Sequence, residues 1–231
     1  MTLRFYYDLL SQPSRALYIF LKMNKIPFED CKVNLSQGEH MTDEYAKINP
    51  FQKVPAIIDG NFQLTESVAI LRYLSREKSV PDFWYPKESK AQAKVDEYLE
   101  WQHINTRLSC AMYFQTKWLQ PILTGKPPKE ERVAFFKKQM IDTLDNVENI
   151  WLKDKLYLTG EKISVADLLG TCEIEQTRMA GYDPCEGRPA LHAWMERVKK
   201  EAHPFYEEAH SRLYRIAQKH KGEPPVSLSK L

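Results

Sequence analysis

The order of strand and helix signals constrains the fold of this chain more than any other feature. Up to about residue 78, short strand-like stretches alternate with helical ones, whereas the remainder shows only helical periodicity. In chain order, we predict a strand ending near Tyr7, a helix over 13–24, a strand over 28–35, a short helix over 43–48, a hairpin of 54–58 and 62–64 joined by Asp59-Gly60-Asn61, and a helix that Thr65-Glu66-Ser67 caps.

This order, β-α-β-α-β-β-α, predicts an α/β thioredoxin-like domain with a mixed four-stranded sheet over residues 1–79. A proline-rich stretch without periodicity follows it, and we place a linker at 80–88. The remaining residues, 89–231, predict an all-α domain. One face of a long helix within it carries apolar residues at every third or fourth position: Val133, Phe136, Met140, Leu144, Val147 and Trp151.

The turn between the first strand and the first helix is where a thioredoxin-like fold carries its chemistry. A redox-active member has Cys-x-x-Cys there, but this chain has Ser11-Gln12-Pro13-Ser14. The helix N-terminus still offers unpaired N–H groups and a partial positive charge. A hydroxyl beside it can donate a hydrogen bond to a thiolate. The pattern therefore predicts that the ligand, rather than the protein, brings the sulfur.

The composition limits the classes of protein to which the chain can belong. A net charge of +2 does not indicate a nucleic-acid-binding protein. Cys31, Cys110, Cys172 and Cys185 are far apart, without metal-ligand spacing, so we predict reduced thiols and no bound metal. No signal segment or stretch of membrane-spanning length is visible. We expect a cytoplasmic protein that does not bind membranes.

Several motifs give the chain a resemblance to a known family. Residues 9–15 (Leu-Leu-Ser-Gln-Pro-Ser-Arg), 53–56 (Lys-Val-Pro-Ala), 64–70 (Leu-Thr-Glu-Ser-Val-Ala-Ile) and 96–103, which begin Asp-Glu-Tyr-Leu, resemble the cytosolic glutathione S-transferases, the theta class in particular. The resemblance implies glutathione as cosubstrate with no other cofactor, a homodimer, and Ser11 as the catalytic, thiol-activating residue. It also implies a cis peptide bond before Pro55.

The resemblance also implies a set of glutathione-binding residues, and elementary chemistry supports several of them. The backbone of Val54 would pair with the cysteinyl amide as an added strand does. Ser67 and the helix N–H groups would take the γ-glutamyl carboxylate, while Glu66 would take the ammonium. His40 and Lys53 would hold the glycine carboxylate. The set also contains Gln12 and Arg107, and Arg107 would face the cleft.

Each of these residues also has a simpler interpretation. Ser11 could be a plain helix cap, with Tyr7 as the catalytic residue instead. His40 and Lys53 could be solvated surface residues, and Arg107 could form a salt bridge along its helix. A cluster of three aromatic residues is the candidate wall of the electrophile pocket, but it could equally belong to the hydrophobic core: Tyr113, Phe114 and Trp118.

Three functions follow from these alternatives. The first is a transferase that conjugates glutathione to small hydrophobic electrophiles in detoxification. The second is a non-catalytic binding or scaffold module of the same fold, and a complete peptide clamp argues against it. A thiol oxidoreductase needs a cysteine at the first turn, where this chain has none. Residues after Gly222 are few, so we expect a closing C-terminal helix to be short or missing, which leaves the electrophile range open.

A last motif predicts stability rather than catalysis. Ser164-Val165-Ala166-Asp167 has the spacing of a capping box with aspartate in place of glutamate. At the start of a buried helix, Ser164 would accept the N–H of Asp167, and Asp167 would accept the N–H of Ser164. We also expect Arg15 to pack beneath the first helix.

Overall fold

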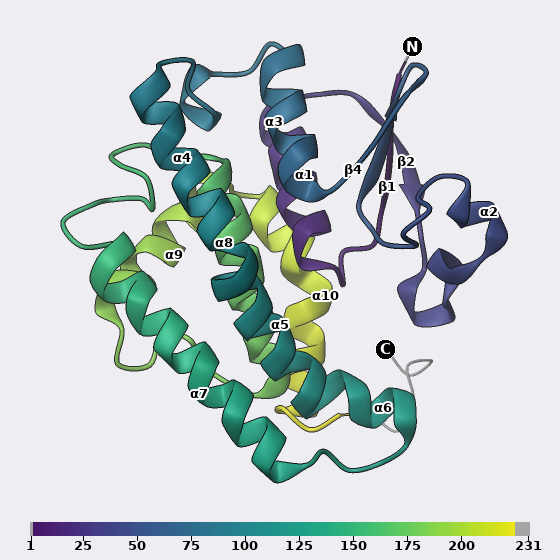
Figure 1. Cartoon of the computed structure of the whole chain (residues 1–231), viewed down its shortest axis with the longest axis vertical. Coiled ribbons are helices and arrows are strands. Elements are labelled where there is room, and N and C mark those ends of the chain that lie inside the picture. The colour runs from purple at the N-terminus through teal and green to yellow at the C-terminus, as the bar shows by residue number, and fades with distance from the viewer. Residues whose placement is uncertain (1, 225–231) are drawn as a thin grey trace.

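The computed structural model describes residues 2–224. Its N-terminal part has the predicted α/β order (Figure 1), with the elements β1 (Leu3–Tyr7), α1 (Gln12–Met23), β2 (Phe28–Lys32), α2 (Asp43–Ala46), β3 (Ala56–Asp59), β4 (Phe62–Thr65) and α3 (Ser67–Glu77). The sheet has the strand order β2-β1-β3-β4. β1 is parallel to β2 and antiparallel to β3, so the sheet is mixed as predicted.

Two local predictions were wrong. β2 ends at Lys32 rather than Leu35, because the Leu35 N–H donates to the Asp8 carboxylate at 3.0 Å. The chain then forms two short 3-10 turns, 35–37 and 39–41, joined by Gly38 with a φ of 74°. The predicted side-chain cap of α3 is not found either. Glu66 occupies the N-cap position with a φ of 66° and no capping hydrogen bond.

The rest of the described chain is helical, as predicted. A 3-10 turn at Asp82–Trp84 lies between α3 and α4. In order, the helices are α4 (Ser89–Trp101), a π-helical turn (His103–Arg107), α5 (Leu108–Phe114), a second π-helical turn (Gln115–Leu119), α6 (Gln120–Thr124), α7 (Glu130–Asn146) with a π-helical end (Val147–Trp151), α8 (Val165–Glu175) with a 3-10 end (Gln176–Ala180), α9 (Pro189–Glu201) and α10 (Phe205–His220).

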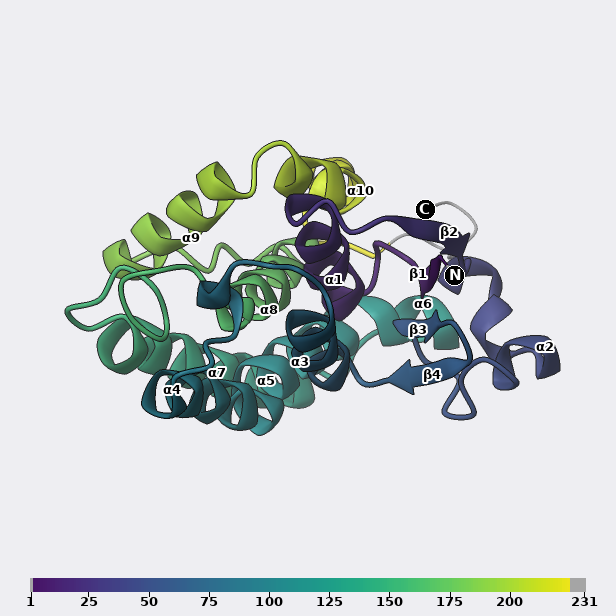
Figure 2. The same cartoon turned by 90° about the horizontal axis from the view of Figure 1, so that it is seen from above.

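Helix α1 joins the two parts of the molecule. Nine consecutive residues of α1, 13–21, are buried, because one face packs on the sheet, where Tyr18 contacts Tyr7 of β1, and the other packs on α8 and α10. All eleven residues of α8 are buried as well. Figure 2 shows α1 and α8 in the middle of the molecule, with α9 and α10 on one side and α3, α4, α5 and α7 on the other. The N-terminus of α1 is therefore held rigidly at the junction.

The predicted capping box lies at the start of α8. Asp167 is fully buried and accepts the N–H of Ser164 at 2.8 Å. The Ser164 hydroxyl in turn accepts the N–H of Ala166 at 3.3 Å. Asp167 also accepts the N–H of Leu158 at 2.9 Å and the indole N–H of Trp194 at 2.8 Å, so it joins α8 to the preceding loop and to α9.

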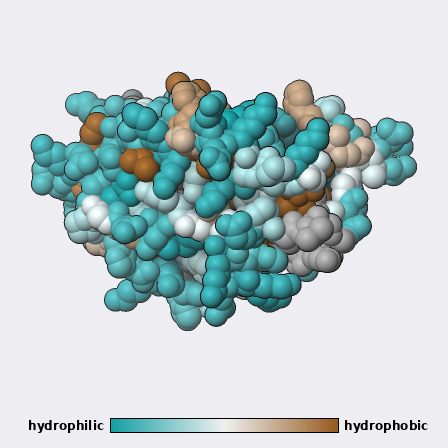
Figure 3. Space-filling model, turned by 90° about the horizontal axis from the view of Figure 1, so that it is seen from below, coloured by the Kyte–Doolittle hydropathy of each residue, from teal (hydrophilic) through white to brown (hydrophobic). Residues whose placement is uncertain are grey.

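The face of the molecule seen in Figure 3 is mostly hydrophilic, with apolar residues in small separate groups. Within residues 2–224, no helix is long and apolar enough to span a membrane. The four cysteines are free thiols, as predicted. None of them lies in the turn before α1.

Candidate active site

A cavity of about 580 Å³ opens at the N-terminus of α1, between the α/β part and the helical part. Both parts contribute to its walls. Eight of the residues predicted for the site line this one cavity, although they come from five separate stretches of the sequence: Ser11, Gln12, His40, Lys53, Val54, Arg107, Phe114 and Trp118.

Ser11 is the N-cap residue of α1 and is 8% exposed. Its backbone is fixed, because its N–H donates to the Asp8 carbonyl at 3.0 Å and its carbonyl accepts the Arg15 N–H at 3.1 Å. Its hydroxyl makes no capping bond and contacts the Val54 carbonyl at a long 3.4 Å. The first turn of α1 contains no acidic residue to offset its partial positive charge. The hydroxyl can therefore donate to an anion in the cavity.

Tyr7, the alternative catalytic residue, lies elsewhere. Its ring is 3% exposed and stacks on Phe5 with a centroid distance of 4.4 Å. It lines a different cavity, of about 380 Å³, together with Asp8 and Arg212. Burial raises the pKa of the Tyr7 phenol well above its ordinary value, and the Asp30 carboxylate raises it further. Tyr7 thus does not line the cavity that contains Ser11, and its phenol is not easily ionised.

His40 and Lys53, which were predicted to hold the glycine carboxylate, both line the cavity. Burial lowers the pKa of His40, and among residues 2–224 its Nδ1 has no hydrogen-bond partner. The Lys53 carbonyl accepts the Tyr45 hydroxyl at 2.8 Å and the Asn49 amide at 2.6 Å. Tyr45 and Asn49, which the sequence analysis did not single out, therefore fix the backbone next to Val54.

The Val54–Pro55 peptide bond is cis, as expected from the resemblance. Glu66 and Ser67 do not line the cavity, although they lie at the start of α3. Arg107 connects Ser67 to the cavity, since its guanidinium donates to the Ser67 hydroxyl at 3.3 Å. The residues predicted for the γ-glutamyl end thus include a charged arginine beside a buried serine.

Only two of the three aromatic residues predicted for the electrophile pocket line the cavity. Phe114 and Trp118 stack with a centroid distance of 5.5 Å and line the cavity. Tyr113 does not line it. Its hydroxyl lies 3.5 Å from the Ala180 carbonyl, and its ring packs on Tyr182 inside the helical core.

Residues that the sequence did not indicate complete the apolar wall: Met41, Phe51, Leu119, Leu123 and Met179. They come from four separate segments, so no local pattern connects them.

Arg15 lies beneath the site and ties it to the helical part. The side chain is fully buried and donates to the Leu9 carbonyl at 2.9 Å. The second terminal nitrogen, Nη2, donates to the Cys172 carbonyl at 3.0 Å and to the Gln176 side chain at 2.7 Å. One guanidinium thus holds the turn that precedes Ser11 against the end of α8.

Glu173, on α8, is a second buried ionisable residue and lies next to Arg107. Its side chain is 1% exposed, and its Oε1 lies 3.9 Å from the Nε of Arg107. No group within residues 2–224 hydrogen-bonds to either carboxylate oxygen. Burial raises the pKa of Glu173 to about 7, although the charges of Arg107 and Arg15 oppose the shift.

We predict a pH effect on stability from Glu173. The pKa of Glu173 in the folded protein lies above the ordinary 4.5, so folding favours the protonated carboxyl. Glu173 therefore costs no stability below about pH 4.5, and it lowers the unfolding free energy as the pH rises to about 7. The loss is at most about 3 kcal/mol of unfolding free energy. Glu173→Gln should flatten the dependence of that free energy on pH between 5 and 8, measured by urea unfolding. The exposed control Glu161→Gln should keep the wild-type slope, and equal slopes in both variants would contradict the prediction.

A thioredoxin-like domain with serine at its functional turn, joined to a helical domain across a shared cavity, is the architecture of proteins that bind a thiol peptide between two domains. Comparison with known proteins identifies the family. Residues 3–76 match the model of the glutathione S-transferase N-terminal domain, and residues 112–201 match that of the C-terminal domain. The chain belongs to the glutathione S-transferase family, in its theta class.

The most similar relatives include human glutathione S-transferase theta-1, which is 45% identical over 98% of this chain and 93% of that protein. The apo structure of human glutathione-S-transferase T1-1 has a TM-score of 0.89 at 44% identity and covers 97% of this chain and 92% of its own. Human glutathione transferase theta-2, solved with glutathione and an unknown ligand, has a TM-score of 0.88 at 38% identity, with coverages of 99% and 96%.

Proposed function

We propose that this protein conjugates glutathione to small hydrophobic electrophiles, with Ser11 stabilising the thiolate. The position of the Ser11 hydroxyl carries the proposal, because it lies at the unneutralised N-terminus of α1 on the wall of a cavity shared by both domains. The family membership of the chain supports it independently. An ordinary thiol has a pKa of about 8.5, and such an environment lowers it to roughly 7.5 or less.

Glutathione would extend through the cavity from His40 and Lys53 to Arg107. His40 and Lys53 take the glycine carboxylate, and the Val54 backbone pairs with the cysteinyl amide. The γ-glutamyl end reaches Gln12 and Arg107 and, beyond the cavity wall, Ser67 and Glu66.

The reaction itself requires little beyond positioning. The thiol loses its proton to solvent, and the thiolate is held by the Ser11 hydroxyl. The sulfur then attacks the electrophilic carbon, a C–S bond forms, and the leaving group departs with its electron pair or, for an epoxide, the ring oxygen accepts that pair. Phe114 and Trp118 offer the electrophile an apolar surface in the cavity that contains Ser11.

A panel of alkyl halides, epoxides and aryl halides tests the proposal. The purified protein should accelerate formation of at least one glutathione conjugate, identified by mass spectrometry. The complex with glutathione should also show thiolate absorbance with an apparent pKa below that of free glutathione. Retention on immobilised glutathione without either property would favour the scaffold module instead.

A prediction concerns the γ-glutamyl end. Ser67→Ala removes the hydroxyl that accepts from Arg107, and Glu66→Gln removes the charge proposed to pair with the ammonium. Both should raise the KM for glutathione about three- to tenfold while changing kcat little, since the lost contacts bind substrate and transition state alike. Steady-state kinetics at saturating electrophile measure this. Unchanged glutathione affinity in both variants would remove Ser67 and Glu66 from the site.

We also propose a homodimer in the cytosol, with α3 and α4 facing a two-fold axis. Ile104 and Leu108, on the continuation of α4, are 75% and 48% exposed, and such apolar side chains suit an interface. Sedimentation should give a dimer at micromolar concentration. Replacing both residues by glutamate should shift the equilibrium toward monomer, and a wild-type protein that sediments only as a monomer contradicts the arrangement.

A further inference from the structure

Residues 34–41 form a segment that contributes to the cavity but has little to hold it in place. Leu35, Ser36, His40 and Met41 all line the cavity. The segment consists of the two short 3-10 turns, and neither turn contains a buried residue. Segments with few buried contacts open locally at low free energy. The order of this segment therefore depends on its polar contacts.

Two side-chain hydrogen bonds join the segment to distant parts of the described chain. The Leu35 N–H donates to Oδ2 of Asp8 at 3.0 Å. The Ser36 hydroxyl accepts from Nη2 of Arg212 at 3.2 Å, across 176 positions of sequence. The other guanidinium nitrogen, Nη1, lies 3.6 Å from Oδ1 of Asp8. Arg212 therefore contacts both the segment and the carboxylate that anchors its start.

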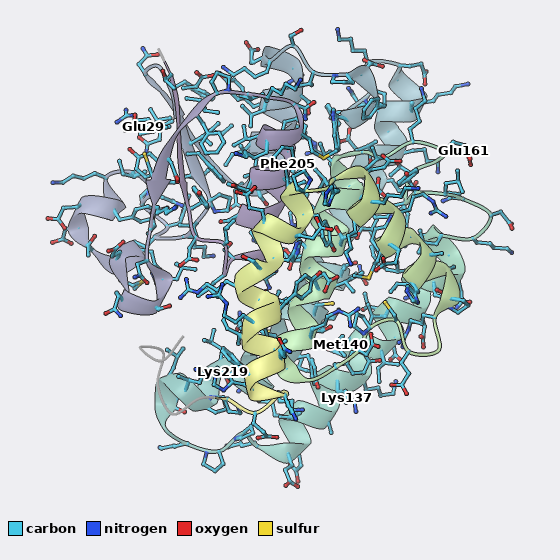
Figure 4. The ribbon with its side chains drawn as sticks, turned by 180° about the vertical axis from the view of Figure 1, so that it is seen from behind. Glu29, Lys137, Met140, Glu161, Phe205 and Lys219 are labelled. Atoms are coloured by element: carbon cyan, nitrogen blue, oxygen red, sulfur yellow. The ribbon has the colours of Figure 1, made fainter. Side chains whose placement is uncertain are left out.

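Arg212 belongs to the helical domain and does not reach the glutathione site itself. It lies on α10, which packs against α1, and Figure 4 shows this helix from Phe205 to Lys219 alongside the N-terminal domain. Arg212 lines the separate cavity that contains Tyr7, not the cavity that contains Ser11. Its contacts with Ser36 and Asp8 connect Arg212 to the segment that lines the cavity of Ser11.

We propose that Arg212 is a positioning residue that holds the His40-bearing segment in place for glutathione binding. The inference rests on the proposed glutathione site. The Asp8 carboxylate is 7% exposed at its side chain and also accepts the Leu10 N–H at 2.8 Å, next to Ser11. The planar guanidinium offers two separate nitrogens, Nη2 to Ser36 and Nη1 to Asp8, whereas an ammonium would have to serve both partners from one atom. The last described helix of the chain thus determines the order of a glutathione-binding segment in the first domain.

Kinetics and hydrogen exchange of Arg212→Gln test the proposal. We expect the KM for glutathione to rise about three- to tenfold, less than for a charged hydrogen bond lost to glutathione itself because Arg212 acts through the segment, with kcat at saturating glutathione within about twofold of wild type. Amides of residues 35–41 should exchange faster in the unliganded variant, while those of α8 should not. Arg212→Lys should fall between wild type and Arg212→Gln.

Arg215→Gln is the matched control, because Arg215 is exposed on the same helix and carries the same charge. It should leave both the KM and the exchange of residues 35–41 unchanged. In a Ser36→Ala background, Arg212→Gln should raise the KM less than it does in wild type, since the two side chains form one contact.

The outcomes separate this proposal from the proposed function. A wild-type protein that forms no conjugate with any electrophile overturns the function, and hydrogen exchange on the unliganded variants then still decides the role of Arg212. Exchange and KM values for Arg212→Gln that equal those of Arg215→Gln overturn the positioning role. If Arg212→Gln does not fold, the same comparison is made with Arg212→Lys.

Discussion

Replacing Ser11 by alanine should lower turnover at pH 7 roughly ten- to hundredfold while leaving glutathione binding nearly intact. The variant loses one hydrogen bond to the thiolate, worth about 1.5–3 kcal/mol. The backbone bonds that fix residue 11, to the Asp8 carbonyl and from the Arg15 N–H, do not involve the hydroxyl and remain. The defect should therefore be chemical rather than structural.

The pH dependence identifies the cause of the Ser11→Ala defect. Loss of the hydrogen bond raises the pKa of bound glutathione, so the rise of kcat/KM with pH should move to higher pH. The gap between variant and wild type should therefore narrow in alkaline solution. Tyr7→Phe is the control, because the phenol lies outside the cavity of Ser11, and its kinetics should stay near wild type. Normal turnover by Ser11→Ala together with an inactive Tyr7→Phe would show that the catalytic residue is misassigned.

Replacing Asp167 by alanine should cost about 3–5 kcal/mol of unfolding free energy. The change leaves four buried donors without their acceptor: the backbone N–H groups of Leu158 and Ser164, the Ser164 hydroxyl and the indole of Trp194. Each unpaired buried donor costs about 1–3 kcal/mol. Loss of the carboxylate also relieves a penalty, because burial raises the pKa of Asp167, so the total stays below the simple sum. Thermal and urea unfolding measure the loss.

Asp142→Ala is the matched control for Asp167→Ala. Asp142 is an exposed carboxylate that pairs with Lys138 at 2.7 Å on α7, and its loss should cost less than about 1 kcal/mol. Folded Asp167→Ala should still conjugate glutathione near the normal rate, because the carboxylate does not line the cavity of Ser11. Unchanged stability with lost catalysis would place Asp167 in the active site.

The order of the elements could be predicted because each signal is local. The Asp-Gly turn of the hairpin, the Ser164–Asp167 spacing and the apolar stripe of α7 all lie within a few residues. The end of β2 could not be predicted, since it depends on the side chain of Asp8 taking the Leu35 N–H from 27 positions away. Local periodicity does not record such a contact.

The site was partly predictable for the same reason. Its motifs identified the residues around the N-terminus of α1, but helical spacing alone could not separate Phe114, which faces the cavity, from Tyr113, which faces the core. That distinction depends on how α5 packs against its neighbours. Glu173 and Arg212 gave no signal, because their partners lie in distant segments.

The contact of Arg15 with α8 bears on how such a protein can be recombined. The N-terminal domain uses one face of α1 for its own sheet and offers the other face, with Arg15, to the Cys172 carbonyl and to Gln176. A chimera that joins this domain to the helical half of a relative would need a matching acceptor at the end of α8. Without one, a guanidinium would be buried against apolar surface beneath Ser11. The exchangeable unit is therefore the α1–α8 pair, which crosses the boundary between the two domains.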